Sequence, residues 1–310
     1  DVKKVSSKDA LKAYQQGVVA GTAWLFSRPE WAGQLDYLFI DEAGQVSLAN
    51  VAAMSRATDN LILLGDQNQL AMPSQGAHPG ESGSSALVYL LQNHAVVPPG
   101  LGVFLGTTYR LHPDICRFIS DAFYDGQLQP DPSTSKQRME MPETSWPVPV
   151  ESGVYFHHIP HEGNTQASDQ EVAAIVEILD VLLGRLFTDS LGNTRPIALD
   201  DILFVAPYNL QVRRLEKTLP AGAKVGSVDR FQGQEAPIVI LSLCSSAGEF
   251  GARGLEFILD RNRLNVAISR AQALAIVVGD KRIGHTSPNS IKELGLLNTF
   301  HQIAFNSYNG

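Results

Sequence analysis

The sequence predicts an α/β fold built from doubly wound, mainly parallel sheets. Short runs that are apolar on both faces recur along the chain, as in strands that are covered by helices on each side. Helical stretches, of which 171–186 is an example, alternate with these runs. A length of 310 residues is enough for two domains that each bury a core. In such sheets the functional residues lie just beyond the carboxyl ends of the strands.

The positions of the apolar runs give the expected strands and domain limits. We expect strands at 17–22, 37–40, 61–64, 103–107, 202–206, 238–243 and 274–278. A Pro/Gly hinge at 94–102 divides the chain into domains at 1–97 and 98–310. The segment 129–149 has five prolines and few aliphatic residues, so we predict that it is a surface insertion.

Composition excludes several classes of protein. Hydrophobic residues make up 44% of the chain and charged residues 18%, which is typical of a folded, water-soluble protein. No apolar run is long enough to span a membrane, so no membrane partner is expected. A net charge of −8 argues against a protein that coats nucleic acid, although it is compatible with a local basic channel. Cys116 and Cys244 form no CxxC pair, which indicates two buried structural thiols in a reducing cytoplasm.

Two expected strands of the first domain end in polar motifs. LDYLFIDEAGQ at 35–45 places Asp41 and Glu42 after an apolar strand. One such carboxylate can hold magnesium through water, and its neighbour can activate the attacking water. LILLGDQNQL at 61–70 places Gln67 and Gln69 after the next strand, where a glutamine can sense a γ-phosphate. Each motif alone is also compatible with a polar turn.

A motif of the second domain places an arginine between a strand and a helix. In TTYRLHPDI at 107–115, Pro113 suits the first turn of a helix, so Tyr109 and Arg110 lie on the connection before it. An arginine there can neutralise charge on a transferred phosphoryl group. The plain alternative is a surface arginine beside a partly buried tyrosine.

Two further motifs follow in the second domain. VGSVDRFQGQEAPIVILSL at 225–243 has Gly233 and Glu235 in a loop between two strands. Glycine lets a backbone approach a ligand closely, and the carboxylate can accept from a ribose hydroxyl. NRLNVAISRA at 262–271 predicts a helix on which Arg263 and Arg270 share one face. A polar hairpin loop and a solvated helix face are the alternatives.

Taken in this order, the motifs resemble those of superfamily 1 helicases. The resemblance is to the 5′-to-3′ branch, which includes the nonsense-mediated-decay and replication-associated helicases and shows DEA-x-Q, GDxxQL, YRMHP, VDxFQGxE and RLNVA[LI][ST]RA. This chain has DEAGQ, GDQNQL, YRLHP, VDRFQGQE and RLNVAISRA. The departures are Leu111 in place of methionine and Gln234 where a basic residue is common. The resemblance covers residues 17–280.

The resemblance implies two RecA-like domains, the first incomplete, and a motor that uses ATP and Mg²⁺ to move along single-stranded DNA, with RNA also possible. Asp41 would bind Mg²⁺ through water, and Glu42 would be the general base. The other implied nucleotide contacts are Gln69 at the γ-phosphate, Tyr109 on adenine, Arg110 and Arg270 as arginine fingers, and Gly233 and Glu235 at the ribose. The implied nucleic-acid contacts are Thr22, Pro73, Tyr208, Asn209 and Ser227.

The phosphate-binding loop of this family does not occur in the sequence. No GxxxxGK[ST] is found among the 310 residues, although that loop supplies backbone donors and a lysine to the phosphates. We therefore expect a piece of a longer protein whose upstream part holds the loop and other domains, such as a nuclease. These residues alone should hydrolyse ATP negligibly. Two alternatives stay open, which are a non-hydrolysing module that binds nucleic acid or a partner, and a transporter or signalling ATPase.

A histidine-rich run, YFHHIPHE at 155–162, raises the question of a metal site. It places His157, His158 and His161 beside Glu162. In a strand, His157 and His158 face opposite ways, which prevents joint ligation of a metal. We expect ordinary surface or strand histidines here.

Overall fold

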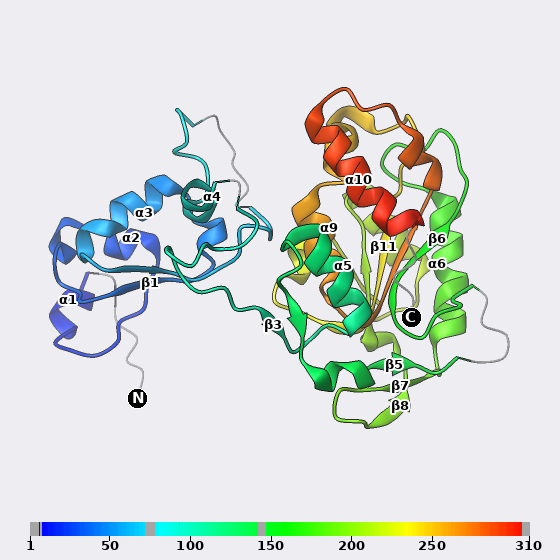
Figure 1. Ribbon diagram of the computed structural model, residues 1–310, viewed down its shortest axis with the longest axis horizontal. Helices are drawn as coiled ribbons and strands as arrows, with labels where there is room; N and C mark the ends of the chain where they lie inside the picture. Colours follow the sequence, from blue (N-terminus) through cyan, green and yellow to red (C-terminus); the bar gives the residue numbers. More distant parts are fainter. Residues whose placement is uncertain (1–5, 7, 72–77, 93, 142–146, 306–310) are drawn as a thin grey trace. The chain divides into compact units, whose positions relative to one another are not determined.

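The chain divides into two units, Asp1–Pro98 and Pro99–Gly310. The computed structural model describes residues 6, 8–71, 78–92, 94–141 and 147–305 (Figure 1). Each unit has a parallel sheet and its own hydrophobic core.

The first unit is built on two short parallel strands. These are β1 (Leu38–Ile40) and β2 (Leu61–Leu63), paired in the register Leu38↔Leu61 to Ile40↔Leu63. Helices pack beside them: α1 (Ala10–Ala13), α2 (Ala23–Phe26), α3 (Leu48–Met54) and α4 (Ala86–Leu91). Short 3₁₀ turns complete the unit: η1 (Pro29–Trp31), η2 (Ala43–Gln45) and η3 (Ser55–Ala57).

Local sequence explains where the longer helices of this unit begin. The Ser47 side chain accepts from the Asn50 amide at 3.2 Å and caps α3. The Ser85 side chain accepts from the Val88 amide at 3.1 Å and caps α4 in the same way. Each cap satisfies an amide that the helix itself leaves without a partner. The core beneath these helices centres on Trp31, which is 1% exposed.

The strand expected at 17–22 is wrong. This segment has no regular structure, and Val18 is 99% exposed. An apolar run forms a strand only where a partner strand and a covering layer are available, and 17–22 has no strand partner within the described part of the unit.

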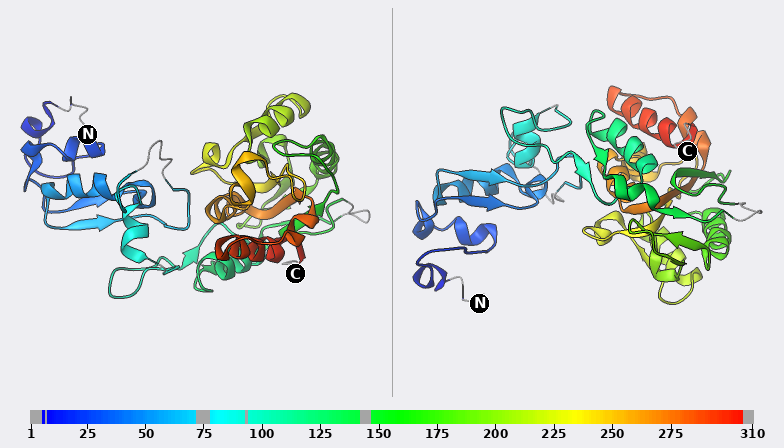
Figure 2. Two further views of the ribbon diagram at one scale, coloured as in Figure 1. Left: turned by 90° about the horizontal axis from the view of Figure 1, so that it is seen from above. Right: turned by 60° about the horizontal axis from the view of Figure 1, so that its bottom comes forward.

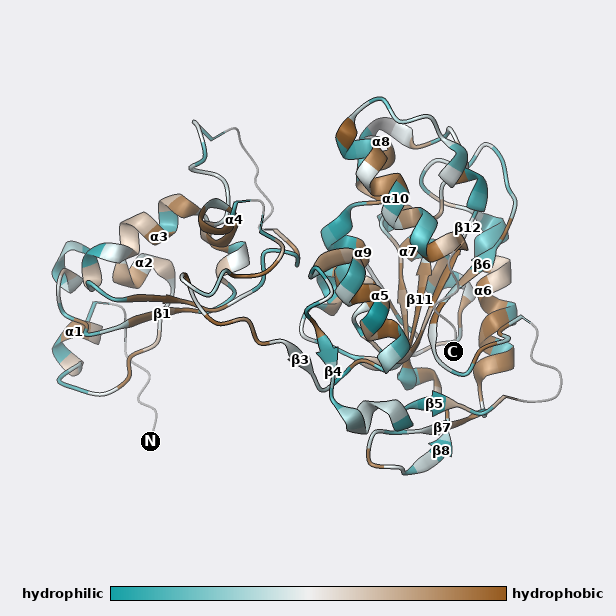
Figure 3. Ribbon diagram, viewed as in Figure 1, coloured by the Kyte–Doolittle hydropathy of each residue, from teal (hydrophilic) through white to brown (hydrophobic). Residues whose placement is uncertain are grey.

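The second unit contains a five-stranded, fully parallel sheet in the order β10-β9-β11-β12-β6. Its strands are β6 (Gly153–His158), β9 (Ile202–Val205), β10 (Lys224–Gly226), β11 (Ala236–Ser242) and β12 (Ala271–Gly279). Every residue of β9 and β11 is buried, as the runs apolar on both faces predicted. These strands are among the most hydrophobic segments of the unit (Figure 3).

Helices cover both faces of this sheet. On one face lie α6 (Asp169–Leu182) and α7 (Asn209–Thr218). On the other lie α5 (Pro113–Phe123), α9 (Arg261–Ile268) and α10 (Ile291–Phe305), and α8 (Gly254–Ile258) packs against α10. The views in Figure 2 show α5 and α10 on the same side of the sheet. The predicted doubly wound α/β class is therefore confirmed. Among the described helices, none is long and apolar enough to cross a membrane.

The segment 129–149 differs from the surface insertion expected there. It contributes β4 (Gln129–Pro130), η4 (Pro132–Lys136) and β5 (Arg138–Met139). β4 pairs with β3 (Thr107–Thr108), and β5 joins β7 (Leu186–Thr188) and β8 (Thr194–Pro196) in an antiparallel sheet. Met139 and Val148 are 0% exposed because both pack into the core beside α6. Pro130 lies in β4 and Pro132 begins η4, and a proline-rich composition does not indicate that Met139 and Val148 are buried.

Short 3₁₀ turns occur in the connections around the sheet. They are η5 (Leu199–Asp201), η6 (Val228–Phe231), η7 (Gly251–Arg253) and η8 (Lys281–His285). Both cysteines are free and buried, which confirms the prediction of structural thiols. Burial raises the pKa of the Cys116 thiol to about 11, so this group stays protonated at neutral pH.

Candidate functional site

Two adjacent carboxylates follow β1 in the first unit. Asp41 and Glu42 come directly after the last strand residue, and both are exposed. The Glu42 amide donates to Asp41 Oδ1 at 2.9 Å. Glu42 has a φ of 50° and a ψ of 41°, a left-handed conformation that non-glycine residues adopt at a cost. The backbone therefore turns sharply here, and the two carboxylates stay exposed at the strand end.

The loop after β2 packs against this turn. A Cβ atom added to Gly65 would lie 2.8 Å from the Ala43 nitrogen, so the glycine permits the close approach of the two loops. Gln69 Nε2 donates to Asp66 Oδ2 at 3.1 Å, which orients the Gln69 amide. The loops that carry Asp41, Glu42 and Gln69 therefore meet at the carboxyl edge of the β1–β2 sheet.

Gln67 and Thr22 lie apart from these carboxylates in the sequence and have other surroundings. Gln67 Nε2 donates to the Ala95 carbonyl at 2.7 Å, so its amide fixes the loop. Thr22 is exposed and precedes α2. Pro73 lies outside the described residues.

Two predicted residues of the second unit form an ion pair. Arg110 Nε donates to Glu235 Oε2, and Arg110 Nη1 also donates to the Ser269 carbonyl at 3.3 Å. Gln272 Nε2 donates to the other oxygen of Glu235 at 2.9 Å. We call Arg110, Glu235, Arg270 and Gln272 the amino-edge cluster, because Glu235 and Arg270 directly precede β11 and β12.

This position corrects the expectation that functional residues lie beyond carboxyl ends of strands. Asp41 and Glu42 follow the carboxyl end of β1, and Arg110 follows that of β3, but Glu235 and Arg270 precede the amino ends of β11 and β12. Burial raises the pKa of Glu235, but hydrogen bonds from Arg110 and Gln272 and the charges of Arg110 and Arg270 outweigh it, so the pKa is lowered. The amino-edge cluster therefore holds an ionised carboxylate against guanidinium groups at neutral pH.

The helix that was expected to carry Arg270 ends before it. α9 stops at Ile268, and Arg270 stands immediately before β12, so Arg263 and Arg270 do not share a helix face. Arg270 is 5% exposed, and its Nη1 donates to the Gln234 carbonyl at 3.4 Å. Apolar residues precede and follow the polar pair Ser269–Arg270, and this short interruption between α9 and β12 is also compatible with one continuous helix.

Tyr109 and Gly233 flank the cluster along the chain. Tyr109 is 74% exposed on the connection between β3 and α5, where the sequence placed it. The alternative prediction, in which Tyr109 is partly buried, is therefore wrong. Gly233 has a φ of 76° and no atom near a would-be Cβ, which leaves its backbone accessible.

A pocket of about 360 Å³ lies at the opposite edge of the same sheet. Tyr208 follows β9 and Ser227 follows β10, and both line the pocket together with Asn209 at the start of α7. Asp229, Arg253, Phe257 and Arg263 also line the pocket and add charged and aromatic groups to it. Sequence reasoning did not assign Arg253 or Phe257 to a site, although arginine and phenylalanine alternate across 250–263.

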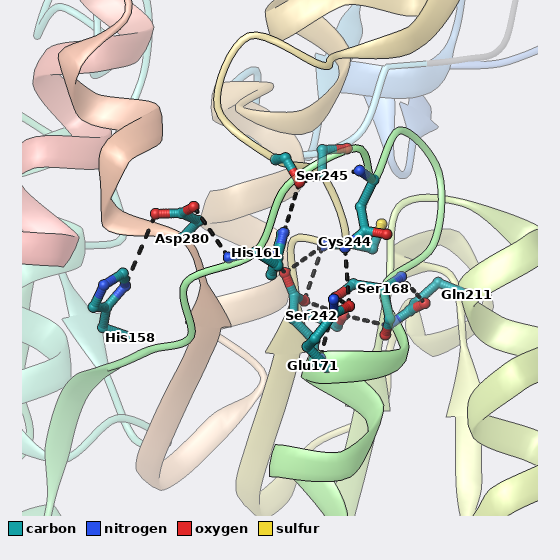
Figure 4. A network of polar contacts seen from close by, with 12 residues as sticks. His158, His161, Ser168, Glu171, Gln211, Ser242, Cys244, Ser245 and Asp280 are labelled. Atoms are coloured by element: carbon teal, nitrogen blue, oxygen red, sulfur yellow. Dashed lines mark hydrogen bonds and ion pairs between the residues drawn. The ribbon is translucent and has the colours of Figure 1, made fainter.

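A buried polar network supports the chain beyond β11 (Figure 4). Glu171, which is 0% exposed, accepts from Ser242 Oγ at 2.5 Å and from the Cys244 amide at 3.0 and 2.9 Å. His161 Nε2 lies 2.8 Å from Glu171 Oε1, and His161 Nδ1 lies 2.8 Å from Ser246 Oγ. The Glu171 network therefore joins α6, the chain after β6 and the start of the segment that leads to Arg253.

The histidine run is only partly as expected. His157 and His158 lie in β6, as strand histidines. His161 is neither a surface nor a strand residue, since it is 4% exposed and both ring nitrogens have partners. Within the described residues, no group of histidine, cysteine, aspartate and glutamate side chains could hold a metal ion by itself.

Comparisons with known proteins add a family match. A family model described as an AAA domain matches residues 84–282. Putative helicase mov-10-B.1 of Danio rerio is 28% identical over 291 residues, which cover 82% of this chain and 28% of that protein. DNA polymerase alpha-associated DNA helicase A of Schizosaccharomyces pombe is 30% identical over 266 residues, covering 80% and 37%. ATP-dependent helicase upf1 of the same yeast is 26% identical over 253 residues, covering 79% and 27%. The chain thus spans well under half the length of these relatives.

Removing the Glu171 carboxylate should destabilise the second unit. In Glu171→Ala, the Ser242 hydroxyl, the Cys244 amide and His161 lose a buried acceptor, which costs about 3–5 kcal/mol of the free energy of unfolding. Asp169→Ala is the matched control on the same helix, because its carboxylate is 81% exposed and pairs with Arg214 at the surface. It should cost less than about 1 kcal/mol. Urea denaturation followed by circular dichroism measures both, and equal losses would contradict the role given to Glu171.

The Arg110–Glu235 pair should make stability depend on pH in the acid range. Because the folded pKa of Glu235 is lower than the ordinary value of 4.5, its contribution is complete above pH 4.5 and is lost as pH falls through the folded value. In Arg110→Gln the pKa of Glu235 should rise, because the substitution removes the charge of Arg110, which lowers this pKa, while burial still raises it. A carboxyl-carbon NMR titration of both proteins measures this shift. An unchanged pKa would show that Arg110 does not contact Glu235 in solution.

Proposed function

Since this chain belongs to the AAA domain family of superfamily 1 helicase-like proteins, we propose that it forms part of a motor that hydrolyses ATP to move along single-stranded nucleic acid. The observation that carries the proposal is the amino-edge cluster, in which two arginines far apart in sequence are held beside one carboxylate. Arginine groups of this kind stabilise the charge of a phosphoryl group in transfer.

The carboxylates of the first unit suit the metal and the water of such a reaction. Asp41 is exposed, and apart from the Glu42 amide no hydrogen-bond partner of its carboxylate is found among the described residues. Its oxygens can therefore accept from the waters of a hydrated Mg²⁺ ion, which would neutralise phosphate charge. We assign the general base to Glu42 and the γ-phosphate contact to Gln69. The Asp66 carboxylate already orients the Gln69 amide.

The second unit would supply the remaining groups around the nucleotide. We assign Arg110 and Arg270 to the phosphates, Tyr109 to the adenine, and Gly233 and Glu235 to the ribose. Glu235 can accept from a ribose hydroxyl only with the oxygens that now face Arg110 and Gln272. Nucleotide binding would therefore exchange the Arg110–Glu235 contact for two contacts with ATP, one from each side chain.

Nucleic acid would contact short polar side chains and backbone. We assign this contact to Tyr208, Asn209 and Ser227, which line one pocket, and to the exposed Thr22; Pro73 is assigned from the sequence alone. Such contacts fix the strand without reading its bases. We favour DNA over RNA as the strand, with the 5′-to-3′ direction. A cytoplasmic location and additional domains such as a nuclease belong to the same proposal.

One observation favours a second function. The 310 residues contain no GxxxxGK[ST], so the alternative is a module that binds nucleic acid or a partner without hydrolysis. Against it, Asp41, Glu42, Arg110 and Arg270 are all present, and a module that only binds has no need of them.

The 310 residues alone should hydrolyse ATP at a rate close to background. The phosphate loop supplies the backbone donors and the lysine that hold the β- and γ-phosphates, and no other segment provides this set. Phosphate release should be measured with and without oligodeoxythymidine. Turnover that the oligonucleotide stimulates strongly in the purified chain would overturn this expectation.

Substitutions at Glu42 and Arg270 test the motor itself. They are made in a protein in which a phosphate-loop segment of a relative is joined ahead of residue 1. Glu42→Gln should abolish turnover and keep ATP binding, and Arg270→Ala should reduce turnover about a thousandfold or more. Glu30→Gln, at an exposed position in η1, is the control and should change neither quantity. A loss of only twofold in either test variant would refute the assigned role.

A further inference from the structure

The pocket at the carboxyl ends of β9 and β10 has a charged wall that the residues assigned so far do not use. The guanidinium carbon of Arg263 lies 4.2 Å from the ring centroid of Phe257, and that of Arg253 lies 4.5 Å from the same centroid. Tyr208 packs against Phe257 from within the pocket, with ring centroids 4.8 Å apart. One aromatic ring thus holds two cationic groups in the same pocket.

Neither of these two arginines is held by a carboxylate of the described residues. Within the part of the chain that the structure describes, no ion pair joins Arg253 or Arg263 to a carboxylate. Arginines that do have a carboxylate partner are Arg110, Arg117, Arg195, Arg214, Arg230 and Arg282. Asp229 also lines the pocket, but it forms no ion pair with either group. The positive charge of the pocket therefore stays available to an anion.

Three features fix the position of these groups. The segment that ends at Arg253 begins at Cys244, whose amide is held by the buried Glu171 carboxylate. The Tyr208 hydroxyl donates to the Phe250 carbonyl at 3.4 Å, which ties the same segment to the end of β9. Arg263 lies on α9, whose first turn is capped by the Asp260 side chain. Ordered guanidinium groups lose less conformational entropy when they bind a ligand.

The anion that suits this pocket is a phosphate group. Two guanidinium groups present several N–H donors in fixed planes, a geometry that matches phosphate oxygens. The hydroxyl of Ser227 and the amide of Asn209 line the same space and can donate as well.

The pocket is too far from the amino-edge cluster for the two to share a nucleotide. β11 has seven residues between Glu235 and the chain that leads to Arg253. A strand of that length separates the two edges of the sheet by about 20 Å. A phosphate bound by Arg253 and Arg263 is therefore not one of the phosphates at Arg110.

We propose that Arg253 and Arg263, oriented by Phe257, bind a backbone phosphate of single-stranded nucleic acid in the pocket at the carboxyl ends of β9 and β10. This inference rests on the proposed function and deepens it, because it names a phosphate subsite and three residues that hold it. A phosphate contact carries no base preference, so the subsite grips any sequence alike. It also gives a chain with a net charge of −8 a local point of attraction for a polyanion.

The test measures how tightly the 310-residue chain binds labelled 12-nucleotide oligodeoxythymidine by fluorescence anisotropy. Arg253→Gln and Arg263→Gln keep the length of the side chain and remove its charge. Each should weaken binding about tenfold or more, as the loss of a hydrogen bond to a charged group does. Each should also reduce the slope of log affinity against log salt by about 0.7, the value for one phosphate of a single strand.

Arg195→Gln is the matched control. It removes the same charge from the same unit, but Arg195 lies on β8 and pairs with Asp201. It should change the affinity less than twofold. Phe257→Leu keeps an apolar side chain but removes the ring beneath the two guanidinium groups, and should weaken binding about threefold, within the range for exposed cation–π contacts. Thermal unfolding midpoints close to that of the unchanged chain confirm that each variant is folded.

The outcomes separate the inference from the proposed function. If the chain binds the oligonucleotide and Arg253→Gln and Arg263→Gln behave like the control, the phosphate subsite is wrong while the proposed function stands. If the chain binds no oligonucleotide, both are overturned. If inorganic phosphate or ATP, at the same concentration of phosphate groups, displaces the oligonucleotide as well as unlabelled oligodeoxythymidine does, the pocket binds small anions and the assignment to a nucleic-acid backbone fails.

Discussion

The parallel direction of all five strands is the constraint on which the second unit depends. Because β10, β9, β11, β12 and β6 run the same way, the sheet has one amino edge and one carboxyl edge. Arg110, Glu235 and Arg270 gather at the first edge, and the pocket of Tyr208 and Ser227 opens at the second. An antiparallel sheet would mix strand beginnings and ends at each edge. The separation of the two sites thus follows directly from the topology.

β11 connects these two edges through a rigid path. Glu235 precedes the strand, every residue of the strand is buried, and Ser242 at its end binds Glu171. Cys244, two residues farther, adopts a positive φ of 54° that its amide contact with Glu171 holds in place. A change of contacts at Glu235 therefore cannot deform β11 locally, because side chains are close-packed on both faces of the strand. Any coupling between the edges must move the strand as a body or act through the chain that leaves it.

The sequence predicts the structure correctly where a short-range pattern decides it. β9, β11 and β12 follow apolar runs, and Asp41 and Glu42 follow a strand as expected, since burial on both faces leaves a local signal. The error at 17–22 has the opposite cause, because a strand also needs a partner that the local pattern does not show. The position of Arg270 depends on where α9 ends and β12 begins, and the two polar residues between them, Ser269 and Arg270, are too short a signal to mark that change.

The parts that no pattern showed depend on contacts between distant segments. His161, Glu171 and Cys244 are brought together by three different elements, and nothing in their spacing indicates a shared network. Arg253 and Arg263 are ten residues apart in the sequence, and each guanidinium group contacts the ring of Phe257, which lies on α8. Motif recognition could not find these residues, since the chemistry resides in their arrangement and not in any one stretch.

In the proposed motor, a nucleotide would replace the Arg110–Glu235 contact without a large rearrangement of the cluster. The two side chains are 32% and 44% exposed, so water screens their attraction and the pair contributes little to stability. A triphosphate carries several negative charges and competes for Arg110 far more strongly than one carboxylate does. Glu235 would then be freed just as a ribose hydroxyl arrives, and Gln272 would keep its carboxylate in place. A weak, half-exposed ion pair is therefore suited to this position, because a strong buried pair would oppose the exchange.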